Sequence, residues 1–422
     1  MWRTRRRMRL GSGHAQRPDR IYDAAMAYTG GRIIHDADAH IMEPPNWLID
    51  HADPAWRDRM PKVFTESLAP GEGEDRFIAQ ARRDHGDAAY RASDGDQIML
   101  RKNFAATGSF LAEDRSRAID LIGVQSQLIF NTFTNGLLAN AEQGDPAYAA
   151  AMSRAHNRAM IEFCSVDQRM LPVTYVPLAD FSDAAVITGE AVEAGAAALM
   201  IASACPANHS PSHIALDPVW AAAQDAGVPI VFHVGGGGSL LSPRYFDNGL
   251  PPVPDFHGGA ENFRSIDYMA IPYPPMQTLS TLLFDGVLDR FPRLKFGVIE
   301  QGASWLPGWM RNLDAAWTAF RKNEERLQAL RASPSDIVRQ QIRVTPYPHE
   351  DAGWIIAQSG PETCLFSSDF PHVEGGRNPL ARFDASLGSI DDAGRRGFFF
   401  NNFVDLMGDV LVRHQLPVSI AA

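Results

Sequence analysis

Eight short apolar runs recur along this 422-residue chain, and stretches with helical spacing separate them. Short apolar runs that alternate with helices are typical of parallel strands joined by helical crossovers. Eight strand–helix units are the number that closes a TIM (β/α)8 barrel, so we expect this α/β fold. An open, doubly wound sheet is the alternative, although no GxGxxG fingerprint follows the first run. The runs are residues 32–38, 125–130, 172–177, 197–202, 228–233, 294–300, 341–346 and 363–369.

Three of the intervening stretches have clear helical character. Residues 145–166 carry Ala, Met and Ile at helical spacing. Residues 216–226 contain an Asp-Pro start signal and end before Gly227, a C-cap signal. We expect one long helix over 303–331, after the sixth run.

Two segments are too long for a minimal barrel and are expected to be insertions. Residues 41–114 follow the first strand and residues 234–275 follow the fifth. Because both leave from carboxyl ends of strands, we expect both to lie over the barrel mouth and to shape a pocket. The sequence thus predicts a single barrel domain over 32–410, a basic, disordered tail over 1–31 and a short tail over 411–422.

Composition narrows the classes of partner. The formal net charge is −11, which disfavours nucleic acid. No apolar run is long enough to span a bilayer, and the basic N-terminus lacks the apolar stretch of a secretory signal. Three cysteines without metal-site spacing are typical of reduced thiols. We expect a cytoplasmic protein that acts on a small molecule and binds neither nucleic acid nor membrane.

Metal-capable side chains stand at the ends of four predicted strands. Asp38 and His40 follow the first run, His233 ends the fifth, Glu300 ends the sixth and Asp369 ends the eighth. Asp38 and His40 are two apart, so on a strand their side chains point the same way. Carboxylate and imidazole ligands from several strand ends suit one divalent ion, zinc or manganese. Asp369 could also act as a general base there.

Several motifs resemble those of a known family. The motifs are DADAHIMEPP (36–45), AHNR (155–158), FHVGG after the fifth run, FPRLKFGVIEQGASWLP (291–307) and FSSDFPH (366–372). They resemble the amidohydrolase-related family (amidohydrolase 2), in the branch of aminocarboxymuconate-semialdehyde decarboxylase and related aromatic-acid decarboxylases. The resemblance implies a distorted TIM barrel, often dimeric, with a mononuclear metal site, most often zinc. It also implies metal ligation by Asp38, His40, His233 and Asp369.

Glu300 departs from the family pattern, in which many members carry a histidine at this strand end. Four roles stay open for Glu300: a metal ligand, a second base, a partner that orients a ligand, or a structural acid paired with an arginine such as Arg311. A carboxylate at this position would repel a substrate carboxylate unless a cation or proton intervenes.

Three further residues are secondary candidates. Glu43 could orient a metal ligand or stabilise the turn after the first strand. His372 could hydrogen-bond a ligating carboxylate or cap its loop. Trp305, with Trp309 four residues later, could stack on an aromatic substrate or pack in the core.

The leading hypothesis is a metal-dependent hydrolase of an amide, lactone or related bond. A metal-bound water or hydroxide would attack the carbonyl, Asp369 would act as acid/base, and His233 and Glu300 would complete the catalytic set. The alternative is a non-oxidative decarboxylase of an aromatic or unsaturated acid, in which Asp369 would protonate carbon. A distant third is an inactive barrel used as a binding scaffold, which would predict lost ligand residues.

Overall fold

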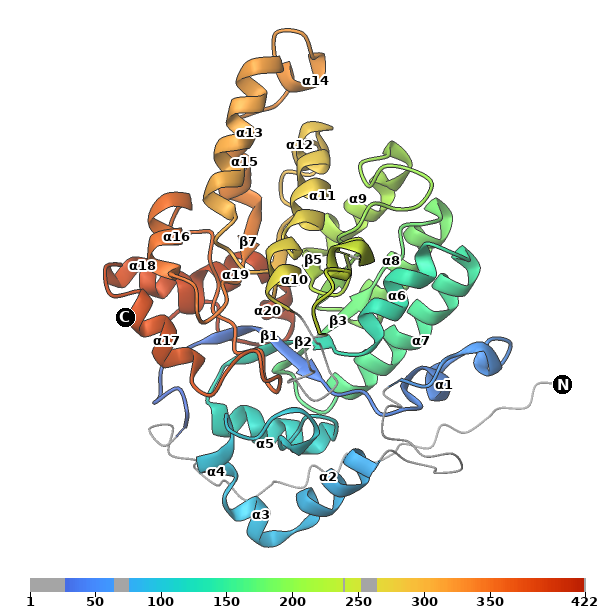
Figure 1. Cartoon of the computed structure of the whole chain (residues 1–422), viewed down its shortest axis with the longest axis vertical. Coiled ribbons are helices and arrows are strands. Elements are labelled where there is room, and N and C mark those ends of the chain that lie inside the picture. Colours follow the sequence, from blue (N-terminus) through green and yellow to red (C-terminus); the bar gives the residue numbers. More distant parts are fainter. Residues whose placement is uncertain (1–26, 64–75, 238–239, 252–263, 421–422) are drawn as a thin grey trace, which may run out of the picture.

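Seven parallel strands form one curled sheet in chain order, and helices surround it (Figure 1). This arrangement is seen in a computed structural model that describes residues 27–63, 76–237, 240–251 and 264–420. Every strand residue is buried, as is typical of parallel strands covered on both faces, although the first strand, HDADAHI, carries four polar residues. The strands are β1 (His35–Ile41), β2 (Ser126–Asn131), β3 (Met170–Tyr175), β4 (Ala198–Met200), β5 (Ile230–His233), β6 (Phe296–Ile299) and β7 (Ile342–Val344).

The eighth apolar run closes the barrel, although it forms two isolated parallel bridges instead of the continuous strand expected over 363–369. Cys364 bridges Val344 of β7, and Phe370 bridges Ala39 of β1. Backbone hydrogen bonds reinforce the closure, including Asp369 N to Asp38 O at 3.0 Å. The predicted TIM barrel is thus confirmed in a distorted form.

The helices follow the order that the alternation predicted. The barrel helices are α5 (Ala112–Ile122), α6 (Thr134–Glu142), α7 (Pro146–Cys164), α8 (Phe181–Ala194), α9 (Asp217–Ala226), α11 (Tyr273–Phe284), α12 (Val287–Arg290), α13 (Leu306–Phe320), α14 (Glu325–Gln328), α15 (Pro334–Gln341), α16 (Ala352–Ser359), α17 (Pro379–Ser386), α18 (Asp392–Arg396), α19 (Asn402–Met407) and α20 (Asp409–Arg413). The insertions carry α1 (Trp47–His51), α2 (Arg76–Gly86), α3 (Ala88–Ala92), α4 (Asp94–Gln97) and α10 (Ser265–Ala270).

Capping residues predicted the ends of two helices correctly, whereas the extent of a third helix was predicted wrongly. The Asp145 side chain caps α7, and Gly227 ends α9 in the left-handed conformation. The single helix expected over 303–331 is wrong. A turn at 321–324 separates α13 from α14, which stands at the tip of the projection in Figure 1.

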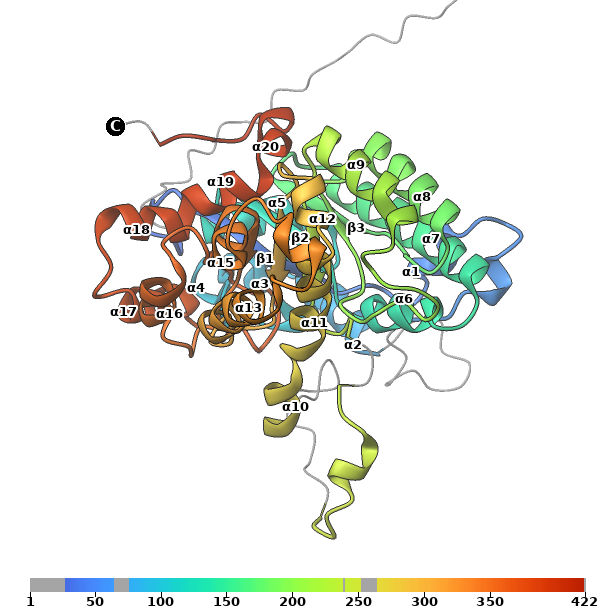
Figure 2. The ribbon, with the colours of Figure 1, turned by 90° about the horizontal axis from the view of Figure 1, so that it is seen from above.

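The two insertions lie differently relative to the end of the barrel where the strands terminate. In the first, Met42 N donates to Ser109 O at 2.8 Å and Asn103 N donates to Pro371 O at 2.9 Å. These bonds hold residues 103–109 against the end of β1 and the loop after the eighth run. In the second, α10 extends away from the body of the molecule, as Figure 2 shows.

The two ends of the folded region differ from the boundaries expected from sequence. Tyr28 N and Thr29 N donate to the carbonyls of Leu121 and Ile122, so the barrel already holds residues before 32. At the other end α20 crosses residue 410, and Leu416 is buried. The rest of the predicted tail, residues 1–26, lies outside the described residues. In the described ranges, no helix combines the length and the hydropathy that crossing a bilayer requires.

Candidate metal centre

The side chains expected at the strand ends converge on one point at the barrel mouth. Asp38 and His40 lie on β1, His233 is the last residue of β5, and Glu300 directly follows β6. Asp369 comes from the closing segment. All five are buried, and the structure groups them in two overlapping clusters whose ligand atoms lie within 4.8 Å of one another.

The distances define a compact cluster of donor atoms. His40 Nε2 lies 3.2 Å from Asp38 Oδ1 and 3.6 Å from both Glu300 Oε2 and Asp369 Oδ1. His233 Nε2 lies 3.2 Å from Glu300 Oε2 and 3.5 Å from Asp38 Oδ1. Two imidazoles and three carboxylates therefore face a common centre.

Hydrogen bonds fix the tautomer of both histidines. Nδ1 of His40 lies 3.0 Å from the carbonyl of Asn131, and Nδ1 of His233 lies 3.0 Å from its neighbour's carbonyl, Val234 O. A carbonyl can only accept, so each Nδ1 carries the proton and each Nε2 turns a lone pair to the centre. Such outer hydrogen bonds are the usual way in which a protein orients histidine ligands of a metal.

The residues present fit a divalent ion. Four buried atoms that face the centre have no hydrogen-bond partner among the described residues: Asp38 Oδ1, His40 Nε2, His233 Nε2 and Asp369 Oδ1. Buried polar atoms normally have partners, and a cation at the centre would supply one to all four.

Backbone geometry turns two of the carboxylates inward. Glu300 and Asp369 have φ angles of 53° and 52°, in the left-handed region that residues other than glycine rarely adopt. Glu300 N donates to Thr345 Oγ1 at 2.8 Å, and Tyr347 Oη donates to Glu300 O at 2.8 Å. Segments after β7 thus hold Glu300 in a strained conformation, as is common at functional sites. Arg311, the alternative partner for Glu300, is exposed on α13.

His372 adjoins Asp369 and links it to the end of β2. His372 Nδ1 lies 3.0 Å from Asp369 Oδ1, and His372 Nε2 lies 2.8 Å from Thr132 Oγ1. The Thr132 hydroxyl donates to Ile41 O, so it accepts from His372 Nε2. Burial lowers the pKa of His372 to about 4. One further proton can therefore be shared between Nδ1 of His372 and Oδ1 of Asp369.

Glu43 lies near the cluster but faces away from its centre. Its carboxylate accepts from the backbone nitrogens of Thr132, Phe133 and Thr134 at 2.9, 3.1 and 3.1 Å. It therefore stabilises the turn between β2 and α6, whereas the sequence suggested the turn after the first strand. Through Thr132 it also supports His372.

A buried polar network beneath the cluster supports β1. Asp36 accepts from Gln127 Nε2 at 2.9 Å and from Ser368 Oγ at 2.6 Å. Arg115, fully buried, donates to Gln127 Oε1 at 3.0 Å and to His40 O at 2.8 Å. The guanidinium therefore fixes the backbone of a residue in the cluster.

The two tryptophans line a separate cavity next to Glu300. Trp305 donates to Gly302 O and Trp309 to Ser280 Oγ, and their rings meet edge to face at 5.4 Å. Together with Gln301, Tyr268, Tyr347 and other residues they line a cavity of about 410 Å³. Trp309 is buried and Trp305 half-buried, so both pack in the fold and still border this space.

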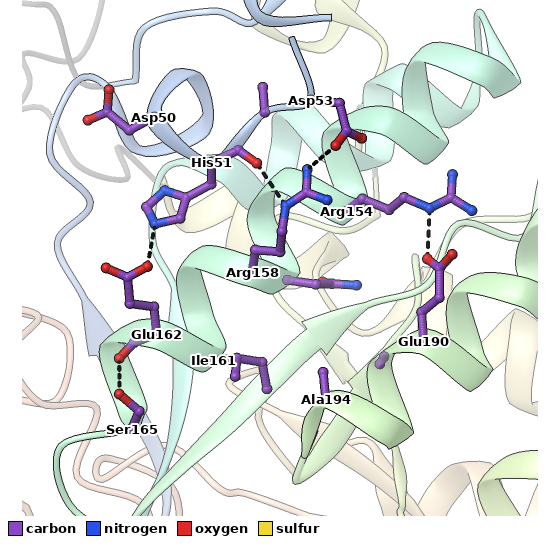
Figure 3. A pocket seen from close by; sticks show the side chains of 13 residues that line it. Asp50, His51, Asp53, Arg154, Arg158, Ile161, Glu162, Ser165, Glu190 and Ala194 are labelled. Atoms are coloured by element: carbon purple, nitrogen blue, oxygen red, sulfur yellow. Dashed lines mark hydrogen bonds and ion pairs between the residues drawn. The ribbon is translucent and has the colours of Figure 1, made fainter. Parts of the chain in front are cut away.

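A cavity of about 760 Å³ lies elsewhere, between α1, α7 and α8 (Figure 3). Its charged side chains satisfy one another: Arg158 pairs with Asp53 at 3.3 Å and Arg154 with Glu190 at 2.7 Å. No residue of the cluster lines it.

Sequence reasoning missed two charged residues beside the cluster. Lys102 lies in the first insertion, and the charges of Asp369 and Glu374 both act on it. Glu374 follows His372 by two residues, and its charge interacts with that of Asp369. Glu374 could have been noticed because it lies two residues after the FSSDFPH segment. No periodic pattern distinguishes Lys102.

Comparisons with known proteins agree with this fold and site. A profile of the amidohydrolase family matches residues 35–402. A search of curated proteins finds no significant match. The chain belongs to the amidohydrolase family, and it is accordingly an enzyme, a metal-dependent hydrolase or carboxy-lyase of that superfamily. The resemblance drawn from the sequence motifs is confirmed.

Several solved structures have a fold similar to that of this chain. An amidohydrolase from Mycobacterium avium subsp. paratuberculosis K-10 is similar at a TM-score of 0.68 and 22% identity, covering 89% of this chain and 98% of that one. A manganese-bound 5-carboxyvanillate decarboxylase from Novosphingobium aromaticivorans DSM 12444 gives 0.58 and 15%, covering 89% and 97%. A manganese-bound dihydroxybenzoic acid decarboxylase from Polaromonas sp. JS666 gives 0.56 and 17%, covering 89% and 97%. At these identities the likeness concerns the fold.

Proposed function

We propose that this enzyme hydrolyses an amide, lactone or related bond of a small molecule with the help of one divalent ion, zinc or manganese. Asp38, His40, His233 and Asp369 would hold the ion, and Glu300 adds a fifth donor. When bound, the ion would polarise a carbonyl and lower the pKa of a water molecule. The observation that carries the proposal is the convergence of three carboxylates, since their combined charge exceeds that of one divalent ion and favours a neutral reacting bond.

The protein's own contribution to the reaction is the movement of a proton at Asp369. The carboxylate is at the mouth, where it can take a proton from the attacking water and return it to the leaving group. His372 Nδ1, 3.0 Å from Asp369 Oδ1, can share that proton between the two steps. His372 Nε2 donates to Thr132 Oγ1, and the Thr132 backbone nitrogen donates to Glu43, so these bonds hold His372 beside Asp369.

Non-oxidative decarboxylation is the second candidate, and two observations favour it. Several proteins of similar fold are decarboxylases of aromatic acids. The cavity of about 410 Å³ beside Glu300 is lined by tryptophan and tyrosine side chains, which suits an aromatic ring. In this reaction Asp369 would deliver its proton to the carbon that loses carbon dioxide.

One assay separates the two candidates. The protein is loaded with zinc or manganese and offered a panel of lactones, N-acyl compounds and hydroxybenzoates. Hydrolysis of a lactone releases acid, which a pH-stat records, and hydrolysis of an N-acyl compound releases an amine, which an amine-reactive dye records. Decarboxylation releases carbon dioxide. Acid or amine release from neutral substrates that Asp369→Asn abolishes would support hydrolysis. Carbon dioxide release from the acids alone would replace it with the second candidate.

A further inference from the structure

Lys102 lies at the barrel mouth, and its ammonium group has no hydrogen-bond partner among the described residues. It directly precedes the short 3₁₀ turn Asn103–Ala105, and the Asn103 N to Pro371 O bond of 2.9 Å places it beside the loop that carries Asp369. Its neighbour Arg101 is fixed on the insertion itself, donating to Asp94 Oδ1 at 2.6 Å and to Ser93 Oγ at 2.7 Å. Lys102 forms no comparable bond within the described residues.

The ammonium group is buried and lacks a hydrogen-bond partner. Lys102 Nζ, Asn103 Oδ1 and Glu374 Oε1 are all buried atoms without a partner among the described residues. A buried, unpaired ammonium is costly in a folded protein, so such a group is normally retained for a ligand or a paired charge. The charges that act on Lys102 are those of Asp369 and Glu374, yet Lys102 forms an ion pair with neither within the described ranges.

The centre carries net negative charge, so a nearby ammonium group can attract an acid that the centre would repel. Asp38, Glu300 and Asp369 carry three negative charges against the two of a divalent ion, so an acid approaching the mouth meets net negative charge. Lys102 supplies a local positive charge on the Asp369 side. An ammonium with three donors can bind a carboxylate through charge-assisted hydrogen bonds.

We propose that Lys102, with Asn103 beside it, binds a carboxylate of the substrate that is separate from the reacting bond. The enzyme would then select small acids, such as the carboxylate-bearing lactones or N-acyl compounds, over their neutral analogues. This inference rests on the proposed function for the identity of the reacting bond, but the binding of the anion does not depend on turnover.

The test compares the binding of benzoate with that of benzamide, measured by calorimetry on metal-free and metal-loaded protein. The variants are Lys102→Met, which removes the charge, and Lys102→Arg, which keeps it. Lys322→Met, an exposed residue on the turn after α13, makes the same change of net charge away from the mouth. Near-ultraviolet circular dichroism checks that each variant folds.

We expect Lys102→Met to weaken benzoate binding at least tenfold, and Lys102→Arg and Lys322→Met to leave it within about threefold, because a charge-assisted bond is lost only in the first. Benzamide binding should not change. Equal benzoate binding in wild type and Lys102→Met, no benzoate binding to the wild type, or benzoate binding that requires metal and ignores Lys102 would each overturn the inference. If a variant of Lys102 unfolds, Lys102→Gln replaces it.

The same variants separate this inference from the proposed function. With turnover of a carboxylate-bearing substrate, Lys102→Met should raise KM at least tenfold and change kcat little. If none of the lactones or amides turns over while the benzoate result holds, the proposed hydrolysis fails and the anion site stands. If hydrolysis proceeds and Lys102→Met changes neither KM nor benzoate binding, only the anion site fails.

Discussion

Removal of metal should lower the thermal stability of this protein, and the size of the effect can be worked out from the buried atoms that face the centre. Asp38 Oδ1, His40 Nε2, His233 Nε2 and Asp369 Oδ1 are buried without partners among the described residues. Each such atom costs about 1–3 kcal/mol, so the four together cost about 4–12 kcal/mol. An unfolding entropy of about 2.1 cal/mol/K per residue gives roughly 0.9 kcal/mol per degree for 422 residues.

Water that enters the centre would recover part of that cost, so we take the lower end and expect chelation to lower Tm by about 5 °C or more. Zinc or manganese should restore it. Differential scanning calorimetry, with elemental analysis of the same samples, measures the shift. His233→Ala should lose the metal-dependent shift. His35→Gln is the matched control, because His35 is a buried histidine on β1, the strand of Asp38 and His40, but it bonds Ser126 and Pro417 instead.

The reasoning fails if wild-type protein binds about one ion per chain and melts at the same temperature with and without it. It also fails if His233→Ala keeps the full shift. A smaller shift that persists in His35→Gln and vanishes in His233→Ala would support the site and lower the cost assigned to each atom.

Three other predictions follow from particular contacts. Asp369→Asn keeps a side-chain oxygen but cannot exchange a proton, so turnover should fall about 10²- to 10⁴-fold. Elemental analysis should still find about one ion per chain. Unchanged turnover would exclude Asp369 as acid/base. Arg115→Met leaves His40 O and Gln127 Oε1 without their donor, and urea unfolding should show a loss of about 2–6 kcal/mol; no loss would mean that the guanidinium bonds contribute nothing. Burial raises the pKa of Glu142 from 4.5 to about 7, so the folded state holds its proton longer than the unfolded state and stability falls as the pH rises between these values. Glu142→Gln should therefore gain up to about 3 kcal/mol at about pH 8 relative to about pH 4; an equal effect at both would contradict this sign.

The barrel could be predicted because its strands are buried on both faces. Continuous apolar runs marked seven of the eight positions correctly, within three residues at the ends. β1 reaches Ile41 instead of ending at 38, because pairing with β2 outweighs the polar side chains of Asp38 and His40. The eighth run deviates for the opposite reason: Asp369 leaves the extended conformation, so the strand breaks where the site needs a turned carboxylate.

The same logic divides the site into parts that sequence could and could not predict. Residues at the ends of parallel strands meet at one edge, so their sequence positions alone bring Asp38, His40, His233, Glu300 and Asp369 together. Lys102 lies beside the loop of Asp369 because of the path of an insertion, and that path depends on single contacts such as the bond from Asn103 N to Pro371 O. No pattern along the chain encodes that path.

Glu300 is where the local structure decides the chemistry. A residue that simply continued β6 would keep an extended backbone, but the bonds with Thr345 and Tyr347 hold Glu300 in a left-handed conformation that costs about 1–3 kcal/mol. A cost of that size is retained where the turned side chain is used, which argues against a purely structural acid. The third carboxylate makes the centre repel acids, and Lys102 across the mouth offsets that repulsion on one side only. Selection of the substrate would then depend on where its negative charge lies relative to the bond that breaks.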